Sequence, residues 1–170
     1  MKTLLSFVLV LSTLAACGQG DKSKRPSPPA LAKETLTNGT TVSIDYSQPA
    51  INGRTIGTDL EPMEGKVWRT GANEATVFEV DKDVKVEGKD LPAGKYGLFT
   101  IMNGNEWTII FNKTWKQWGA FSYKEADDAL RVKVNAATNS PAAERMTFTI
   151  NKDGKISLMW GDRLVVFTIN

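Results

Sequence analysis

Alternation of apolar and polar residues, repeated between turn signals, is the feature that most constrains the fold of this chain. Val42, Ile44 and Tyr46 alternate with polar residues, and the same pattern returns over residues 130–135 and 146–151. A period of two is typical of a strand with one buried face. Two further stretches, "YGLFTI" and "WTIIFN", are apolar on both sides and are expected to be central strands. From about Thr35 onward the sequence therefore predicts β-structure throughout.

The turn signals agree with this interpretation. Asn103-Gly104, Asp153-Gly154 and Gly161-Asp162 each separate two predicted strands and tolerate the positive φ of tight hairpins. The last three strands are therefore expected to form a meander. A helical turn is expected only within residues 123–131.

The strand count predicts the fold class. Roughly ten strands of about five residues are more than one flat sheet comfortably holds. We expect an all-β, two-sheet antiparallel β-sandwich, jelly-roll-like, in a single domain over residues 35–170.

The N-terminus has the pattern of an export signal. Lys2 precedes an apolar run that is too short for a comfortable membrane span and that ends in Leu14-Ala15-Ala16-Cys17. This tetrad resembles the lipobox of bacterial lipoproteins, which implies a signal peptide over residues 1–16 and lipidation of Cys17. A plain secretory signal with a chance cysteine is the alternative. Multiple acyl chains on Cys17 would give a stable membrane anchor.

Residues 17–34 are predicted to be an acylated cysteine followed by a flexible tether, because they are rich in Gly, Ser, Lys and Pro without an apolar period. The expected location is the bacterial cell envelope, and the export signal together with the tether indicates lipid anchoring at the outer membrane. One acid, Asp21, lies near Cys17, where some surface-exported lipoproteins carry a pair, so the periplasmic and surface faces both stay open.

Composition excludes several function classes. The 170 residues carry a net charge of +2 without a basic stripe, so we expect no nucleic-acid partner. Histidine is absent and Cys17 is the single cysteine, which removes the usual base, an internal disulfide and a thiolate zinc site. No phosphate loop or serine elbow is present. We expect neither a metal nor a cofactor.

A polar cluster lies in "VWRTGANEAT", residues 67–76, between two predicted strands. Gly71 and Asn73 tolerate a left-handed backbone, so a sharp reversal is expected, with Arg69 and Glu74 close enough for a bidentate pair. An internal Arg69–Glu74 brace is the favoured interpretation, since no standard catalytic base lies nearby. The alternative is a ligand site formed by Trp68, Arg69, Asn73 and Glu74.

Two further patches are candidates for function. The stretch "TWKQWGAFSY" contains Trp115 and Trp118, which either stack on a ligand such as a sugar or plug the open end of the sandwich. Asp45 and Arg54 are expected to form a surface ion pair. Glu74 with Asp45 or Asp59 is a candidate carboxylate pair for a histidine-free hydrolase of glycans or esters.

Several strings occur in order from residue 43 to residue 134: "SIDYSQP", "GRTI", "KVWRTGANEAT", "LPAGKYGLFTI", "EWTIIFN", "QWGAFSY" and "LRVKV". Together they resemble the domain-of-unknown-function 2911 family (DUF2911), secreted or lipid-anchored proteins found mainly in Bacteroidota. The resemblance implies an all-β sandwich and brings no established catalytic residue. Met63 and Glu64 stand where the family pattern has an aromatic turn.

These features lead us to expect a lipid-anchored envelope protein that acts as a ligand-binding or accessory module, with a small molecule or glycan as ligand. The hydrolase and a structural envelope component with protein partners are the alternatives.

Overall fold

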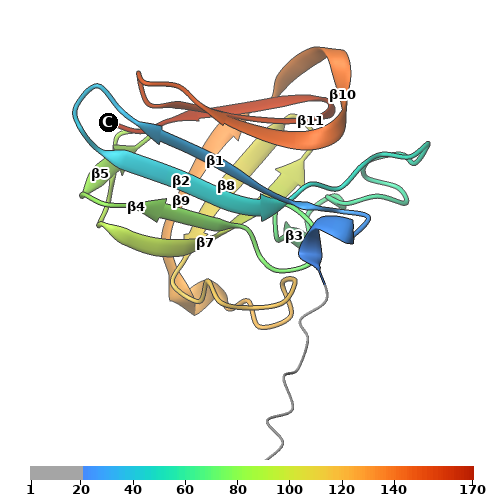
Figure 1. The fold of residues 1–170 in the computed structure, drawn as a ribbon, viewed down its shortest axis with the longest axis horizontal. Helices are drawn as coiled ribbons and strands as arrows, with labels where there is room; N and C mark the ends of the chain where they lie inside the picture. The colour runs from blue at the N-terminus through green and yellow to red at the C-terminus, as the bar shows by residue number, and fades with distance from the viewer. Residues whose placement is uncertain (1–20) are drawn as a thin grey trace, which may run out of the picture.

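The computed structural model describes residues 21–170, and Cys17 with the signal peptide lies outside the described residues. These residues form eleven strands and two short 3-10 turns, η1 and η2 (Figure 1). The elements are η1 Lys22–Lys24, β1 Pro29–Thr35, β2 Thr41–Ser47, β3 Val67–Trp68, β4 Val77–Val80, β5 Val84–Val86, β6 Lys89–Leu91, β7 Gly94–Asn103, β8 Glu106–Asn112, η2 Glu125–Asp127, β9 Asp128–Asn135, β10 Ala137–Ile150 and β11 Lys155–Thr168.

A seven-stranded antiparallel sheet is the main layer. Its order is β1-β2-β4-β7-β8-β9, and β3 pairs separately with β7. The long strands β10 and β11 form a hairpin of their own, and β5 and β6 form a small one. The end of β11 is joined to β5, since the Lys85 N–H donates to the Asn170 carbonyl and the Glu87 N–H to that of Thr168.

The β10–β11 hairpin lies across one face of the main sheet (Figure 1). Aromatic contacts join the two layers, because each of three rings on the hairpin packs on a ring of the main sheet. The pairs and their centroid separations are Tyr46–Phe148 at 5.1 Å, Phe111–Phe167 at 6.1 Å and Trp68–Trp160 at 6.5 Å. This packing confirms the expected all-β sandwich.

The other face of the central strands is covered as well. Phe99 of β7 and Ile110 of β8 are fully buried in a second cluster, against which Ala120 and Tyr123 of the following loop pack. This burial explains why "YGLFTI" and "WTIIFN" are apolar on both sides, and it confirms their central position.

Two of the predicted turns are confirmed. Asn103-Gly104 joins β7 to β8, and Asp153-Gly154 joins β10 to β11. The predicted turn at Gly161-Asp162 is wrong, because β11 runs through it as one strand of 14 residues. Gly161 has φ +59°, and a Cβ there would lie 2.7 Å from Ile56 Cδ1, so this glycine serves close packing inside a strand.

The tether also ends earlier than expected. Residues 29–34, which we assigned to a flexible tether over 17–34, belong to β1 and pair in register with β2. The pattern was hidden because β1 is an edge strand whose side chains are half-buried or exposed, with Leu31 largely exposed.

The turn at Gly154 provides a test of the hairpin geometry. Gly154 has φ +85°, and an added Cβ would lie 1.9 Å from the carbonyl oxygen of Ile169. Gly88, at φ +78°, has open space at the same position. We expect Gly88→Ala to cost about 1–2 kcal/mol from backbone strain, and Gly154→Ala to cost about 1–3 kcal/mol more from overpacking. Urea unfolding of both variants measures the difference, and equal losses would contradict the close approach to Ile169.

Candidate functional site

The stretch 69–76 is a tight corner between β3 and β4. Thr70 and Asn73 have positive φ, +51° and +60°. A β-branched residue is a rare occupant of this region, so the backbone at Thr70 is strained and its surroundings must hold it. Gly71 leaves no room for a side chain, since a Cβ would lie 2.9 Å from Thr76 Oγ1.

Buried hydrogen bonds hold the corner in this conformation. The Thr76 hydroxyl donates to the Thr70 carbonyl at 2.7 Å, and the Thr70 hydroxyl donates to that of Thr100 at 3.1 Å. The Trp68 indole N–H donates to the Gly71 carbonyl at 3.1 Å. The polar groups of the corner therefore satisfy its own backbone, as a brace would.

The expected Arg69–Glu74 brace is nevertheless wrong. Glu74 forms ion pairs with Lys22 at 3.0 Å and with Arg25 at 2.8 Å, both from the N-terminal segment. Arg69 is directed elsewhere, and its buried Nε has no hydrogen-bond partner among the described residues. The sequence does not predict this pairing, because Lys22 and Arg25 lie in the stretch whose composition indicates a tether.

Asn73 binds the same N-terminal segment two residues after Arg25. Its amide donates to the Ser27 carbonyl at 3.0 Å. The N-terminal residues 22–27 thus cross the corner and are bound to it at two positions.

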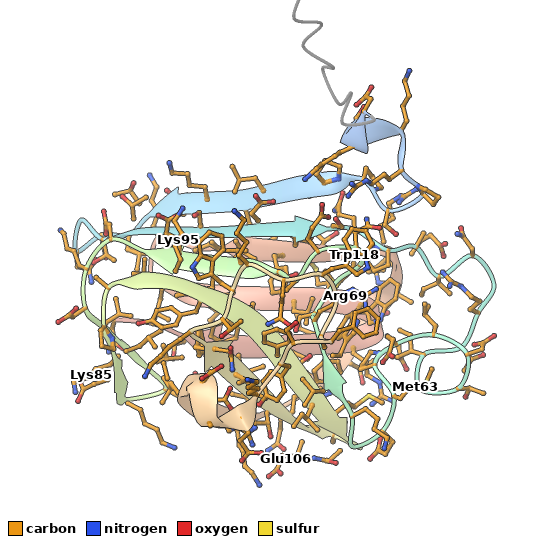
Figure 2. The ribbon with its side chains drawn as sticks, turned by 90° about the horizontal axis from the view of Figure 1, so that it is seen from below. Met63, Arg69, Lys85, Lys95, Glu106 and Trp118 are labelled. Atoms are coloured by element: carbon orange, nitrogen blue, oxygen red, sulfur yellow. The ribbon has the colours of Figure 1, made fainter. Side chains whose placement is uncertain are left out.

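The loop after β8 joins the corner from the other side. The Ala75 N–H donates to the Gln117 carbonyl and the Gly119 N–H to that of Asn73, both at 3.0 Å. These bonds bring the two patches that we singled out in the sequence into contact. Trp118 lies beside Glu74 and toward the same end of the domain as Arg69 (Figure 2).

The first cavity, which we call the tryptophan cavity, has a volume of about 390 Å³. The Arg25 guanidinium lies 5.9 Å above the Trp118 ring, which is 55% exposed, and Lys95 lies 5.6 Å above Trp115. The lining residues are Lys22, Arg25, Pro29, Asp45, Tyr46, Ser47, Glu74, Ala75, Val77, Trp115, Lys116, Gln117 and Trp118.

The second cavity, which we call the arginine cavity, has a volume of about 240 Å³. It is lined by Ser27, Pro49, Arg54, Asp59, Leu60, Glu61, Met63, Trp68, Arg69, Gly71, Ala72 and Trp160. Burial lowers the pKa of Arg69, and the nearby charge of Glu61 acts in the opposite direction. The predicted site residues are therefore divided: Trp68 and Arg69 line this cavity, while Glu74, Trp115 and Trp118 line the tryptophan cavity. Asn73 lines neither and binds the N-terminal segment instead.

The expected Asp45–Arg54 surface pair is also wrong. Asp45 lines the tryptophan cavity, whereas Arg54 lines the arginine cavity and donates to the carbonyls of Ala50 and Ile51. The Asn52-Gly53 turn lies between Asp45 and Arg54 in the sequence, and it reverses the chain so that Arg54 contacts the residues just before the turn.

The candidate carboxylates are divided in the same way. Asp45 shares a cavity with Glu74, and Asp59 does not. Burial alone raises the pKa of Glu74, but hydrogen bonds from its own backbone, Lys22 and Arg25, with the charge of Lys22, bring the net pKa below its ordinary value. Glu74 is thus ionised at neutral pH and is suited to accept hydrogen bonds rather than to donate a proton.

Several residues of these cavities had no local signal in the sequence. Trp160 comes from β11, about 90 residues after the corner, and donates its indole N–H to the Glu61 carbonyl at 2.8 Å. Tyr46 reads as an ordinary strand residue. Residues 21–170 contain no group of three or more potential metal ligands and no helix long and apolar enough to cross a bilayer.

The ion pairs of Glu74 predict a response to acid. Because its folded-state pKa lies below the ordinary value of 4.5, the attachment of Lys22 and Arg25 is intact above pH 4.5 and is lost as the pH falls through the lower folded-state value. We expect the Trp118 indole N–H resonance to shift over this range, because Arg25 leaves its ring. Nuclear magnetic resonance spectra between pH 6 and pH 3 measure this shift.

Two variants control this titration. Glu74→Gln should remove the shift, while Glu79→Gln, which breaks the separate ion pair to Lys95, should keep it. A Trp118 shift that persists unchanged in Glu74→Gln would contradict the assignment.

Comparison with known proteins gives the family and no further relative. No curated protein and no solved structure matches the chain. The family model described as a protein of unknown function (DUF2911) matches residues 27–169. This range includes every strand described above, the whole lining of the arginine cavity, and the lining of the tryptophan cavity except Lys22 and Arg25. The chain therefore belongs to the DUF2911 family.

Proposed function

We propose that this protein is a lipid-anchored binding module of the bacterial cell envelope, and that its tryptophan cavity takes a small hydroxylated ligand such as a sugar unit of a glycan. The observation that carries the proposal is the convergence of Trp115, Trp118, Asp45 and Glu74 around one open cavity. The cavity's volume of about 390 Å³ lies in the range of small-molecule sites.

The chemistry of the lining favours a sugar. Indole rings offer flat apolar faces, and Trp118 is half-exposed with Arg25 above its ring. Hydroxyl groups need donors and acceptors at the rim of such a ring. Asp45, Ser47 and Lys116 line the cavity, and their side chains make no hydrogen bond within the described part of the chain, so they are free to bind hydroxyls.

A hydrolase at the same cavity is the second candidate function. Asp45 and Glu74 both line it, and a carboxylate-based mechanism uses two acidic side chains at one site. The lowered pKa of Glu74 and its two ion pairs give it the role of an acceptor, so Asp45 would have to be the proton donor. A binding function needs no proton donor, and we therefore place the binding function before the hydrolase.

The lipid anchor is supported by the sequence before the domain. Leu14-Ala15-Ala16-Cys17 follows an apolar run, and the family match begins ten residues after Cys17, at residue 27. We propose that the anchor places the domain at the outer membrane, where glycans are abundant.

Trp118 provides the test of sugar binding. We expect Trp118→Ala to weaken binding of a disaccharide by about five- to tenfold, because loss of one stacked ring costs about 1–1.5 kcal/mol. Isothermal titration with disaccharides of glucose, galactose, mannose and N-acetylglucosamine measures the affinity. Product analysis of the same mixtures separates binding from hydrolysis.

Phe121 is the matched control, because it is 87% exposed on the same loop and does not line the cavity. Phe121→Ala should leave the affinity unchanged. Equal effects of the two substitutions, or no disaccharide binding by the parent protein, would count against the tryptophan cavity as a sugar site.

The anchor has a separate test. Cys17→Ser should move the protein from the membrane fraction to the soluble fraction of the cells, because no acyl chain can be attached. Ser12→Ala, in the same apolar run, leaves Cys17 in place and should not change the distribution. Membrane association that survives Cys17→Ser would refute lipidation.

A further inference from the structure

The arginine cavity is not used by the proposed function, and its polar groups are unequally engaged. Asp59 accepts a hydrogen bond from the Thr55 N–H and Glu61 from the Met63 N–H, so both carboxylates are bound to their own loop. Arg54 is bound to two backbone carbonyls. Arg69 is the exception, since its buried Nε has no hydrogen-bond partner among residues 21–170. The charge of Glu61 acts on Arg69, but no ion pair joins the two side chains in the described residues.

A buried guanidinium nitrogen without a hydrogen-bond partner is costly, even in a half-buried side chain such as Arg69. A charge removed from water must be compensated by an opposite charge or by hydrogen bonds, and a buried charge without them destabilises the fold. Burial lowers the pKa of Arg69, and the charge of Glu61 offsets this only in part. An oxyanion in the cavity would supply the missing partner.

The backbone next to Arg69 is held in a strained conformation. Thr70, the next residue, has φ +51° and is fixed by hydrogen bonds to Thr76 and Thr100. Trp68, the preceding residue, is buried and fixed to Gly71. Strain that is maintained by its surroundings is typical of positions where a side chain is pre-organised for binding.

From these observations we propose that the arginine cavity is a second binding site, which takes a small oxyanion, a carboxylate or phosphate group, on the guanidinium of Arg69. The planar guanidinium binds either group through two parallel hydrogen bonds. The cavity of about 240 Å³ is smaller than a typical drug-sized site, so it suits a small anion or the charged end of a larger ligand.

The two sites are structurally distinct. Ser27 is bound to Asn73 and lines the arginine cavity, whereas Lys22 and Arg25, earlier in the same segment, line the tryptophan cavity. The N-terminal segment thus passes from one cavity to the other, and a ligand can occupy each independently.

The experiment uses sodium acetate and inorganic phosphate as probes, titrated at constant ionic strength into a chain that begins at Asp21. This chain retains all the strands and both core clusters described above. We expect saturable binding of at least one probe by isothermal titration, and at least tenfold weaker binding by Arg69→Gln. The relative affinities of acetate and phosphate identify the preferred group.

Three further variants make the result specific. Arg163→Gln removes an arginine outside the cavity and should bind within twofold of the parent. Ala72→Leu fills the cavity while keeping Arg69, and it should lose binding even where Arg69→Gln fails to fold. Trp118→Ala should leave anion binding intact, which separates this site from the sugar site. Absence of saturable binding to both probes, or binding that survives Ala72→Leu, would overturn the proposal.

Discussion

Two buried tryptophans, Trp68 and Trp160, hold the layers and the loops of this protein together. Their rings stack at 6.5 Å between the end of β3 and strand β11 of the hairpin. Each indole N–H also donates to a carbonyl of a loop, Trp68 to Gly71 and Trp160 to Glu61. The contact that joins the hairpin to the sheet therefore also fixes the loops that contain Gly71 and Glu61, which line the arginine cavity. The hydrophobic core and the polar corner thus stabilise each other.

The N-terminal segment completes the functional end of the domain. It reaches the corner through the ion pairs of Glu74 and the hydrogen bond of Asn73, while the loop after β8 reaches it through backbone bonds. Three segments that are far apart in the sequence thus meet at one corner. The N-terminal segment and the corner contribute residues to both cavities, and the loop after β8 contributes to the tryptophan cavity.

The sequence predicted the parts of the fold that depend on local patterns. Alternation at Val42, Ile44 and Tyr46 and the glycine turns at Gly104 and Gly154 need no distant partner, and the structure confirms them. Gly161 shows the limit of such reasoning. A glycine that is required because a Cβ would clash with Ile56 cannot be told from a turn glycine in the sequence.

The candidate site was predictable in its residue types and not in its pairings. Trp68, Arg69, Glu74, Trp115 and Trp118 all line a cavity, as their density in two short stretches indicated. The partner of Glu74 could not be found, because the choice between Arg69 and two basic residues about 50 positions away is made by tertiary packing. The same holds for Trp160, which enters from the last strand.

The early start of the ordered fold has a consequence for how the domain would face a bilayer. Lys22 lies five residues after Cys17, and an extended chain spans at most about 3.6 Å per residue, so the two stay within about 18 Å of each other. With a lipid on Cys17, the domain would stand on a very short stalk, and Lys22 and Arg25 would turn the rim of the tryptophan cavity toward the headgroups. In this orientation, saccharides attached to membrane lipids would lie closer to the cavity than saccharides free in solution.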